Sequence, residues 1–504
     1  MNPTDEQVEA LRLFATGDSL AIEAGAGTGK TSTLVLLSES DLKRRGQYIA
    51  FNKALVEDGK GKFPAPVSAN TAHSLAFRAY GNRFASRLRD SQRMPSHDIA
   101  RRLGLDPLQV TDFDGKPKTL AAGFLAGLCS KAVRGFCQSA DQTIAEWHFP
   151  FIEGLDEIGD DGKQRFDTNR YVRRELLPYA RAMWDDTLLP RGWVPYQHDH
   201  YLKAWQLSDP RIDVDYVMFD EAQDANPVIA AIVAAQGSHA QLVYVGDSQQ
   251  EIYSFTGAVN ALANVQVDHR TYLTQSFRFG QAIADEANVI LDKLNAPLRL
   301  RGNPAIDSVV EALASPNAIL TRTNAAAIRN LLSCLQDATD VHLIGGAADI
   351  IAFCTAAEEL MTIHHTSHPE LAVFGSWMDV QMYVEQEPEG EDLRLMVRLI
   401  DEFTPRGIID AMRAMSREDQ AEVVISTAHK SKGRQWPTVQ LASDFKRPKE
   451  KDNAGEQRLL YVAVTRAQNT LDIEALADEE EKALEARDNQ IDAGLGTGYI
   501  GEFK

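Results

Sequence analysis

The glycine-rich segment at residues 24–31, Ala-Gly-Ala-Gly-Thr-Gly-Lys-Thr, constrains the fold of this chain more than any other feature. A short apolar run at residues 19–23 precedes it, and a helical pattern at residues 32–38 follows it. Glycines let backbone N–H groups turn inward around phosphate oxygens, and the N-terminus of the next helix adds a positive dipole. Because strand, loop and helix come in the right order, a chance glycine-rich turn is the weaker explanation. The segment predicts a nucleotide phosphate site in an α/β fold.

Two side chains of this segment have specific expected roles. Lys30 is expected to contact the β- and γ-phosphates, and the Thr31 hydroxyl is expected to ligate Mg²⁺. The standard pattern begins with glycine, and Ala24 takes that position here, but three glycines remain. The predicted phosphate-binding residues are Ala24, Gly25, Ala26, Gly27, Thr28, Gly29, Lys30, Thr31 and Ser32.

A pair of carboxylates provides the second half of the predicted site. Asp220 and Glu221 directly follow an apolar run at residues 215–219. Carboxylates at the C-terminal end of a parallel strand lie where ligands bind in such sheets. We expect Asp220 to hold Mg²⁺ through water and Glu221 to orient and deprotonate the attacking water. An acidic surface turn is the less favoured alternative, because a phosphate loop is already present upstream.

Strand-like runs alternate with helical patterns along much of the chain, which predicts parallel sheets with both faces covered by helices. Two regions, residues 81–205 and 353–420, read as mainly helical and interrupt this alternation. The long separation between Lys30 and Asp220 also indicates an inserted domain. We therefore expect two α/β domains, each with a helical insertion, and an acidic tail at residues 476–504.

Composition excludes several classes of protein. Hydrophobic residues make up 44% of the 504 residues, and the net charge of −20 rules out a globally basic nucleic-acid coat protein. The four cysteines show no metal-binding spacing, which favours free thiols in a reducing cytoplasm. No signal peptide and no run long enough to span a membrane is visible. We expect a cytoplasmic protein, associated with the nucleoid, or with the host cytoplasm if a phage encodes it.

Further motifs follow the phosphate loop in a fixed order. They read NPTDEQ at residues 2–7, FNKA at 51–54, TAHS at 71–74, VGDSQQEIY at 245–253, LTQSFRFG at 273–280, STAHKSKG at 426–433 and EQRLLYVAVTRA at 456–467. Together with the phosphate loop and the carboxylate pair, this set resembles superfamily 1 DNA helicases of the UvrD/PcrA/Rep type. It looks most like the F-box DNA helicase branch and its prokaryotic and viral relatives, and we expect no F-box segment ahead of the motor.

The resemblance implies two RecA-like motor domains with ATP bound between them. The first would comprise residues 1–80 and 206–270, and the second residues 271–352 and 421–475. Gln7 would read adenine, Gln250 would sense the γ-phosphate, and Phe277 would stack on adenine. Arg278 and Arg466 would bind γ-phosphate charge, with Arg458 a weaker candidate. Gln435 would contact the ribose, in place of the Glu that is usual in the family.

The resemblance also implies contacts to one DNA strand. Short polar side chains and backbone amides would bind phosphates, and aromatic rings would stack on bases. The residues that match these motifs are Phe51, Asn52, Thr71, His73, Tyr253, Phe255, Thr427 and His429. Thr256 replaces the usual Arg after Phe255, which puts one bridging contact in doubt.

The function that the resemblance implies is an ATP-dependent DNA helicase or single-stranded DNA translocase that moves 3′ to 5′, with ATP and Mg²⁺ as cofactors. Expected partners are single-stranded DNA and its junctions with duplex DNA; the sequence identifies no recombination, replication or repair partner. One alternative is an ATP-gated DNA-binding or remodelling subunit with weak or no unwinding alone, motivated by the short second insertion and Thr256. A helicase-nuclease is disfavoured, because no room for a nuclease is seen after Leu471.

Several other polar residues have two readings. Two basic clusters could bind phosphates or could be solvated helix faces, and the sequence does not choose between these readings. For His198 and His200, a packing or polar-contact role is favoured over metal binding, since further ligands are not visible. The clusters are Arg83, Arg87, Arg89, Arg93, Arg101 and Arg102, and Lys446, Arg447, Lys449 and Lys451.

Overall fold

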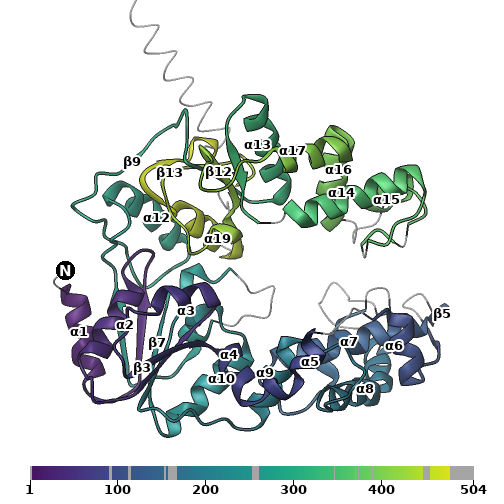
Figure 1. The fold of residues 1–504 in the computed structure, drawn as a ribbon, viewed down its shortest axis with the longest axis horizontal. Coiled ribbons are helices and arrows are strands. Elements are labelled where there is room, and N and C mark those ends of the chain that lie inside the picture. The colour runs from purple at the N-terminus through teal and green to yellow at the C-terminus, as the bar shows by residue number, and fades with distance from the viewer. Residues whose placement is uncertain are drawn as a thin grey trace, which may run out of the picture. The chain divides into compact units, whose positions relative to one another are not determined.

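The computed structural model of the chain describes residues 3–89, 94–111, 115–152, 155–156, 167–252, 260–345, 347–368, 370–372, 374–386, 391–445 and 454–476. These residues fold into two compact units (Figure 1). Unit 1 comprises Met1–Ala24 and Gly29–Leu273, and unit 2 comprises Gly25–Thr28 and Thr274–Lys504. Apart from Leu476, the expected acidic tail lies outside the described residues.

Unit 1 is built on a six-stranded sheet in the order β3-β2-β6-β7-β1-β8, and every described pairing in it is parallel. Its central strands are buried along their whole length, which explains why they read as nearly continuous apolar runs. The strands are β1 (Leu20–Ala24), β2 (Gly46–Ala50), β3 (Val67–Thr71), β6 (Tyr216–Phe219), β7 (Gln241–Gly246) and β8 (His269–Leu273).

Two apolar clusters cover this sheet. One joins its strands to side chains of α1 (Asp5–Phe14), α2 (Lys30–Glu39) and α3 (Lys53–Gly59). The other joins them to α4 (Ala72–Ala79), α9 (His198–Leu207), α10 (Pro227–Ala235) and α11 (Ala261–Asn264). Strand β8 pairs with β1 and extends three residues past residue 270, where we expected the first motor domain to end.

The first insertion forms a helical body with its own apolar core. Its helices are α5 (Ala85–Arg89), α6 (Ser96–Leu103), α7 (Ala122–Gln138) and α8 (Thr168–Thr187), and α7 packs against α6, α8 and α9. Helix α9 serves both bodies, because Ala204 packs in the insertion while Trp205 packs under the sheet. An antiparallel hairpin of β4 (Leu108–Thr111) and β5 (Pro117–Leu120) adds strands that the sequence did not reveal.

Unit 2 contains a second six-stranded sheet in the order β11-β12-β10-β13-β14-β9, again parallel in every described pairing. Helix α13 (Asn324–Gln336) packs on β10 to β12, and α12 (Gln281–Lys293) packs on β14 and on α19 (Ala454–Val464). The strands are β9 (Val309–Val310), β10 (Ala318–Thr321), β11 (Val341–Leu343), β12 (Val423–Thr427), β13 (Trp436–Leu441) and β14 (Ala467–Asp472).

The second insertion differs from the first because it shares one apolar core with its sheet. Ile319 and Leu331 of the sheet part pack in the same cluster as Phe353 and Ile408 of the insertion. The helices are α14 (Ala347–Thr362), α15 (Trp377–Gln386), α16 (Glu391–Phe403) and α17 (Pro405–Ala414), so the helical segment begins before the expected residue 353.

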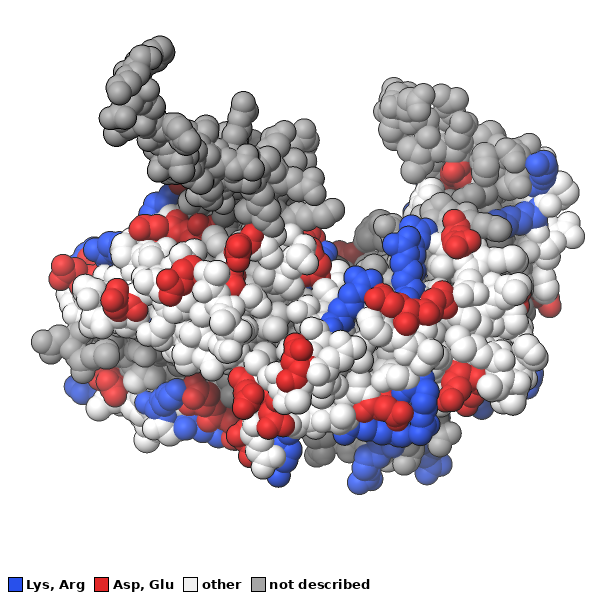
Figure 2. Space-filling view, turned by 90° about the horizontal axis from the view of Figure 1, so that it is seen from above, with Lys and Arg blue, Asp and Glu red and all other residues white. Residues whose placement is uncertain are grey.

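Two surface properties bear on function. No helix in the described part of the chain is both long and apolar enough to cross a membrane. On the face drawn in Figure 2, acidic and basic side chains are interspersed among the residues that the structure describes. Neither sign of charge forms one continuous field among the described residues on that face.

Candidate nucleotide and DNA site

The phosphate loop connects β1 to α2, as the sequence predicts. Strand β1 ends at Ala24, and α2 begins at Lys30, two residues before the expected start at residue 32. Gly27 and Gly29 have φ values of 72° and 80°, in the left-handed region that favours glycine. Gly29 is the N-cap of α2 and has no side chain, so the first N–H groups of the helix have no side-chain cap. The loop geometry suits an anion at the N-terminus of α2.

Lys30 lies among carboxylates of two other strands. Its Nζ is 3.3 Å from Glu221 Oε1. Burial by itself would lower the pKa of Lys30, but the charges of Glu221, Asp247 and Asp220 outweigh burial and hold the pKa above its usual value. Lys30 therefore stays protonated and positively charged at the start of α2.

Asp220 is buried at the end of β6, and its two carboxylate oxygens have different partners. Oδ2 accepts a hydrogen bond from Tyr48 Oη at 2.8 Å, and Oδ1 accepts one from the Glu221 backbone N–H at 2.9 Å. Burial, followed by the charge of Glu221, raises the pKa of Asp220, while Lys30 opposes this. Glu221 has φ 53°, a conformation that is rare for a residue other than glycine. The turn that follows β6 thus holds two carboxylates side by side.

A chain of amide and carboxylate groups extends from Glu221 to Gln250. Gln223 Nε2 donates to Glu221 Oε2 at 2.5 Å, and Gln223 Oε1 accepts from the Asp247 backbone N–H at 3.1 Å. Asp247 Oδ2 in turn accepts from Gln250 Nε2 at 2.7 Å. The structure thus brings together the predicted residues Lys30, Asp220, Glu221 and Gln250. Gln223 and Asp247, which join these residues, were not among the predicted site residues, although Asp247 lies in the motif at residues 245–253.

Gln7 lies beside the phosphate-loop helix. Its Nε2 donates to Thr33 Oγ1 of α2 at 3.0 Å, and its Oε1 accepts from the Thr4 backbone N–H at 3.0 Å. Thr4 and Gln7 together form a capping box at the start of α1. These bonds hold the Gln7 side-chain amide beside the first turn of α2, which follows the phosphate loop. Adenine recognition by Gln7 remains a prediction.

In unit 2, both predicted arginines donate hydrogen bonds to Thr465. Arg278 donates from Nε to Gln435 Oε1 at 2.8 Å and from Nη1 to the Thr465 carbonyl at 2.9 Å. Arg466 is only 1% exposed and donates to the carbonyls of Val462 and Arg434. Gln435, which was expected to contact ribose, is thus a hydrogen-bond partner of Arg278 in this structure.

The loop residues Gly25–Thr28 belong to unit 2 by their contacts. The Ala26 N–H donates to Tyr461 Oη at 3.1 Å, and the Phe277 N–H donates to the Gly27 carbonyl at 2.8 Å. Backbone groups of the phosphate loop are therefore hydrogen-bonded to the segments that carry Arg278 and Arg466. Tyr461 lies in the motif at residues 456–467, but no role was predicted for it.

Three of the predicted DNA contacts are helix N-caps. Asn52 Oδ1 caps α3, Thr71 Oγ1 caps α4, and Thr427 Oγ1 caps α18 (Ala428–Ser431). Each cap accepts a hydrogen bond from one backbone N–H of the first helical turn. The other N–H groups of that turn point out of the helix end, which carries a partial positive charge. Phe51, next to the first cap, is 40% exposed. This arrangement suits phosphate oxygens at the caps and a base on Phe51.

The remaining predicted DNA-contact residues lie in different surroundings. His73 Nε2 lies 3.4 Å from Asp199 Oδ1 at the start of α9, and this partner lowers the pKa of Asp199. Burial, then the charge of Arg322, lowers the pKa of His429, so its ring is neutral near pH 7. Tyr253 and Phe255, with the departure at Thr256, lie outside the described residues.

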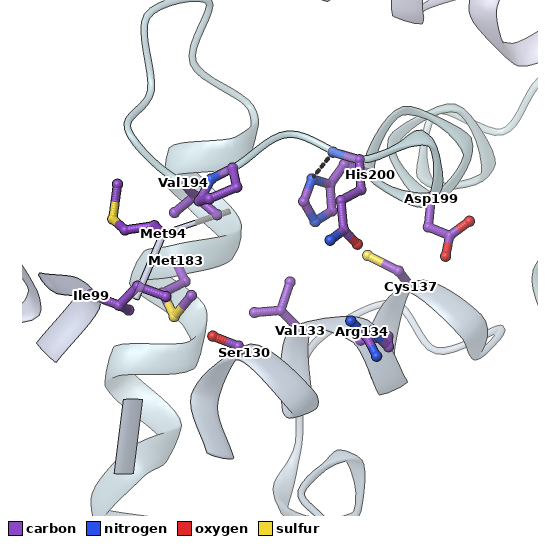
Figure 3. A pocket seen from close by; sticks show the side chains of 12 residues that line it. Met94, Ile99, Ser130, Val133, Arg134, Cys137, Met183, Val194, Asp199 and His200 are labelled. Carbon is purple, nitrogen blue, oxygen red and sulfur yellow. Dashed lines mark hydrogen bonds between the residues drawn. The ribbon is translucent and has the colours of Figure 1, made fainter. Parts of the chain in front are cut away.

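The first insertion contains a cavity of about 560 Å³ that none of the sequence-predicted site residues lines. Apolar side chains such as Met94, Ile99 and Met183 form part of its wall (Figure 3). His200 closes another part, and its Nδ1 accepts a hydrogen bond from the Gln197 N–H at 3.1 Å. This contact agrees with the polar-contact role expected for His200.

The arginine cluster of the first insertion is divided by the structure. The side chain of Arg87 is only 9% exposed, and its guanidinium donates to the carbonyls of residues 186, 187, 189 and 194, so neither reading of the cluster holds for it. Arg83 lies over the ring of Tyr80, and Arg102 lies near Trp193. Arg93 and the second basic cluster lie outside the described residues.

Models of two protein families match the chain. An AAA domain matches residues 7–256, and a UvrD-like helicase C-terminal domain matches residues 422–472. The first match contains the phosphate loop and the carboxylate pair, and the second contains Thr427, His429 and Arg466.

Two curated relatives are similar over most of the chain. F-box DNA helicase 1 of Gallus gallus is 30% identical over 497 residues, which cover 90% of this chain and 47% of the relative. F-box DNA helicase protein 1 of Schizosaccharomyces pombe is 28% identical over 498 residues, which cover 90% of this chain and 55% of the relative. The chain thus spans about half the length of these relatives. Both family models, the two parallel sheets and the ordered motifs thus agree in relating the chain to the UvrD-like superfamily 1 helicases.

Proposed function

We propose that the chain is an ATP-dependent DNA helicase and single-stranded DNA translocase that moves 3′ to 5′. The observation that carries this proposal is the single hydrogen-bonded cluster of Lys30, Asp220, Glu221 and Gln250 at the ends of β1, β6 and β7. Such a cluster supplies the charges that ATP hydrolysis needs, and the family matches connect it with DNA. The proposed substrates are ATP and single-stranded DNA, including its junctions with duplex DNA.

The Lys30–Glu221 ion pair supports a simple route to hydrolysis. A γ-phosphate that binds Lys30 would compete with Glu221 for the cation, and Glu221 would then accept a proton from water. The water oxygen forms a bond to the γ-phosphorus, the bond from that phosphorus to the bridging oxygen of ADP breaks, and the proton passes to Glu221. Gln250 would report the γ-phosphate to the rest of unit 1 through Asp247.

The oxygen donors around Lys30 fit Mg²⁺. The Thr31 hydroxyl and the buried Asp220 carboxylate are hard oxygen ligands of the kind that Mg²⁺ takes alongside phosphate oxygens and water. When bound, the ion would neutralise phosphate charge. Tyr48 orients the Asp220 carboxylate by donating to one of its oxygens.

We further propose that Arg278 and Arg466 act on the same nucleotide from the second motor domain. Arginine fingers of this kind accelerate phosphoryl transfer by about 10³-fold or more. Binding ATP would close the two domains on each other and hydrolysis would release them, so that the surfaces at Asn52, Thr71 and Thr427 move along one strand. In this proposal, residues 1–80 with 206–273 and residues 274–352 with 421–475 are the motor domains, and the protein works where DNA is, at the nucleoid or in a phage-infected cytoplasm.

The second candidate is an ATP-gated DNA-binding or remodelling subunit that strips proteins or recombination intermediates from DNA. The observation that favours it is the small second insertion, four helices that share the core of their sheet. Thr256 in place of Arg points the same way. Both candidates require ATP hydrolysis stimulated by single-stranded DNA, and they differ in strand separation.

The test compares unwinding of 3′-tailed and 5′-tailed duplexes by the wild-type protein and by Glu221→Gln. The proposal expects DNA-stimulated ATPase and unwinding of the 3′-tailed duplex, and a fall in kcat of about 10²- to 10⁴-fold in Glu221→Gln with ATP binding retained. Translocation on single strands without unwinding would favour the second candidate. A wild-type protein whose ATPase ignores DNA would refute both.

A further inference from the structure

Glu23 is a buried charge in a strand that is otherwise apolar. Strand β1 reads Leu-Ala-Ile-Glu-Ala and is covered on both faces, and Glu23 is only 3% exposed. Its side chain points to the same side of the sheet as Ala21, because side chains alternate along a strand. A carboxylate in such a place is costly unless hydrogen bonds satisfy it. Glu23 directly precedes the phosphate loop, yet none of the roles given above uses it.

Both carboxylate oxygens of Glu23 bind one residue of the turn after β7. Oε1 accepts from the Ser248 backbone N–H at 2.7 Å, and Oε2 accepts from the Ser248 hydroxyl at 2.9 Å. Arg270 of β8 lies near, with Nη1 3.9 Å from Oε2. Burial raises the pKa of Glu23, and the bonds from Ser248 oppose that rise. The two hydrogen bonds thus clamp Ser248 from the side of β1.

Ser248 is held from its other side as well. Asn260 Nδ2 donates to the Ser248 carbonyl at 3.2 Å, and Asn260 Oδ1 caps α11. Arg270 Nη2 donates to the carbonyls of Leu262 and Val265 at the end of α11. Glu23 and Asn260 therefore hold Ser248 directly, and Arg270 links Glu23 to the end of α11.

The clamped residue begins the short turn η5 (Ser248–Gln250), which carries Gln250. The Gln250 side chain donates a hydrogen bond to Asp247, the residue before Ser248. Asp247 also accepts from the Gln249 N–H through Oδ1 at 3.0 Å. A shift of Ser248 would therefore move both the backbone of Gln250 and the carboxylate that orients its side chain.

We propose that Glu23 is a positioning residue for recognition of the γ-phosphate: it ties the strand that ends at the phosphate loop to the turn that carries Gln250. The inference rests on the proposed function, since it takes ATP as the ligand and Gln250 as the group that meets its γ-phosphate. ADP lacks that phosphate and contacts neither Gln250 nor its turn in this scheme. Loss of Glu23 therefore weakens binding of the triphosphate and leaves binding of the diphosphate in place.

The test measures the affinities of ADP and of a non-hydrolysable ATP analogue, both with Mg²⁺, for the wild-type protein and three variants. Glu23→Leu keeps most of the volume and removes both acceptors, so its analogue affinity should fall roughly tenfold, the size of one lost hydrogen bond to a charged group. Its ADP affinity should stay within about twofold of wild type. Glu23→Gln keeps an acceptor oxygen for the Ser248 N–H and should recover most of the analogue affinity.

Ser248→Ala is the third variant, because it removes one hydrogen bond from the opposite side and leaves the core of β1 intact. It should lower the analogue affinity less than Glu23→Leu does, without changing ADP binding. The inference is overturned if folded Glu23→Leu binds both nucleotides like the wild type, or loses both equally. It is also overturned if Glu23→Leu does not fold and Ser248→Ala retains full preference for the triphosphate.

These readouts separate the inference from the proposed function. Nucleotide affinities are measured without DNA, whereas the proposed function is tested by DNA-stimulated hydrolysis and unwinding. A wild-type protein that prefers the triphosphate but ignores DNA would refute the helicase proposal and leave the role of Glu23 standing. If the wild-type ATPase is stimulated by DNA but Glu23→Leu keeps its preference for the triphosphate, the helicase proposal stands and the role of Glu23 is refuted.

Discussion

Unit 1 contains two groups of buried charges that are satisfied in different ways. Where β1, β6 and β7 end, Lys30 lies against Glu221. The charges of Asp220 and Asp247 also stabilise the Lys30 cation. In the first insertion, Lys203 donates to the carbonyls of Ser139 and Asp141 and to Gln206 Oε1. At the strand ends, ionised side chains pair with one another. In the insertion, buried cations donate mainly to backbone oxygens.

The difference separates binding groups from structural ones. A side-chain ion pair can change partner when a phosphate arrives, because each ion can turn toward the ligand. A cation that donates to fixed carbonyls has no such freedom, and its removal leaves several buried acceptors unsatisfied. Arg87 is a second cation of the structural kind, with four carbonyls as acceptors. Burial of a charge therefore does not by itself mark a functional site.

The largest expected effect separates the two lysines. Lys30→Met removes the cation that would meet the phosphates, and we expect DNA-stimulated kcat/KM to fall by about 10³-fold, as for loss of a charged transition-state contact. The measurement is steady-state ATPase with saturating single-stranded DNA.

Lys203→Met is the matched control for this comparison. It should lower the stability of the first insertion by about 3 kcal/mol, since it leaves buried acceptors without a donor. Below the unfolding temperature its KM for ATP should stay within about twofold of wild type. Equal losses of activity in both variants, at full stability, would break the distinction.

The second prediction compares Arg87 with its neighbour Arg89. Arg87→Ala should destabilise the insertion by about 3 kcal/mol, because a buried charged hydrogen-bond network loses its donor. Arg89→Ala, at an exposed position two residues away, should change stability by less than about 0.5 kcal/mol. Hydrogen exchange of the amides in α7 and α8 measures both. Similar protection in the two variants would show that Arg87 is a surface cation after all.

The smallest effect is a pH dependence confined to the insertion. Burial lowers the pKa of His200 from 6.5 to about 4. Because the folded state resists protonation, the contribution of this residue to stability is complete above about pH 6.5 and is lost as the pH falls through 4. At pH 5 the loss should be roughly 2 kcal/mol.

His200→Gln provides the control for this titration. Gln at the third position of α9 can still bond the Gln197 N–H, as in a capping box, but it does not titrate. The difference in stability between wild type and variant should therefore change between pH 7 and pH 5. Parallel pH profiles would show that His200 is not the titrating group.

Much of the site was readable from the sequence because its signals are local. The phosphate loop, the carboxylates after β6 and the order of strands and helices are each written within a few consecutive residues. The hairpin β4–β5 was missed because its strands have four residues each and are largely exposed, so their apolar pattern is weak. The polar residues at 52, 71 and 427 were read as DNA contacts, and their second role as N-caps appeared only with the helix boundaries.

The sequence by itself determined that a phosphate loop joins a strand to a helix, and that two carboxylates end another strand. Only the tertiary structure decided which buried charges satisfy one another. Glu23 and Ser248 are 225 residues apart, and Tyr48 and Asp220 are 172 apart, so no local pattern relates them. The physical reason is that neighbouring strands in a parallel sheet come from distant parts of the chain. A buried carboxylate must find its partner across those strands.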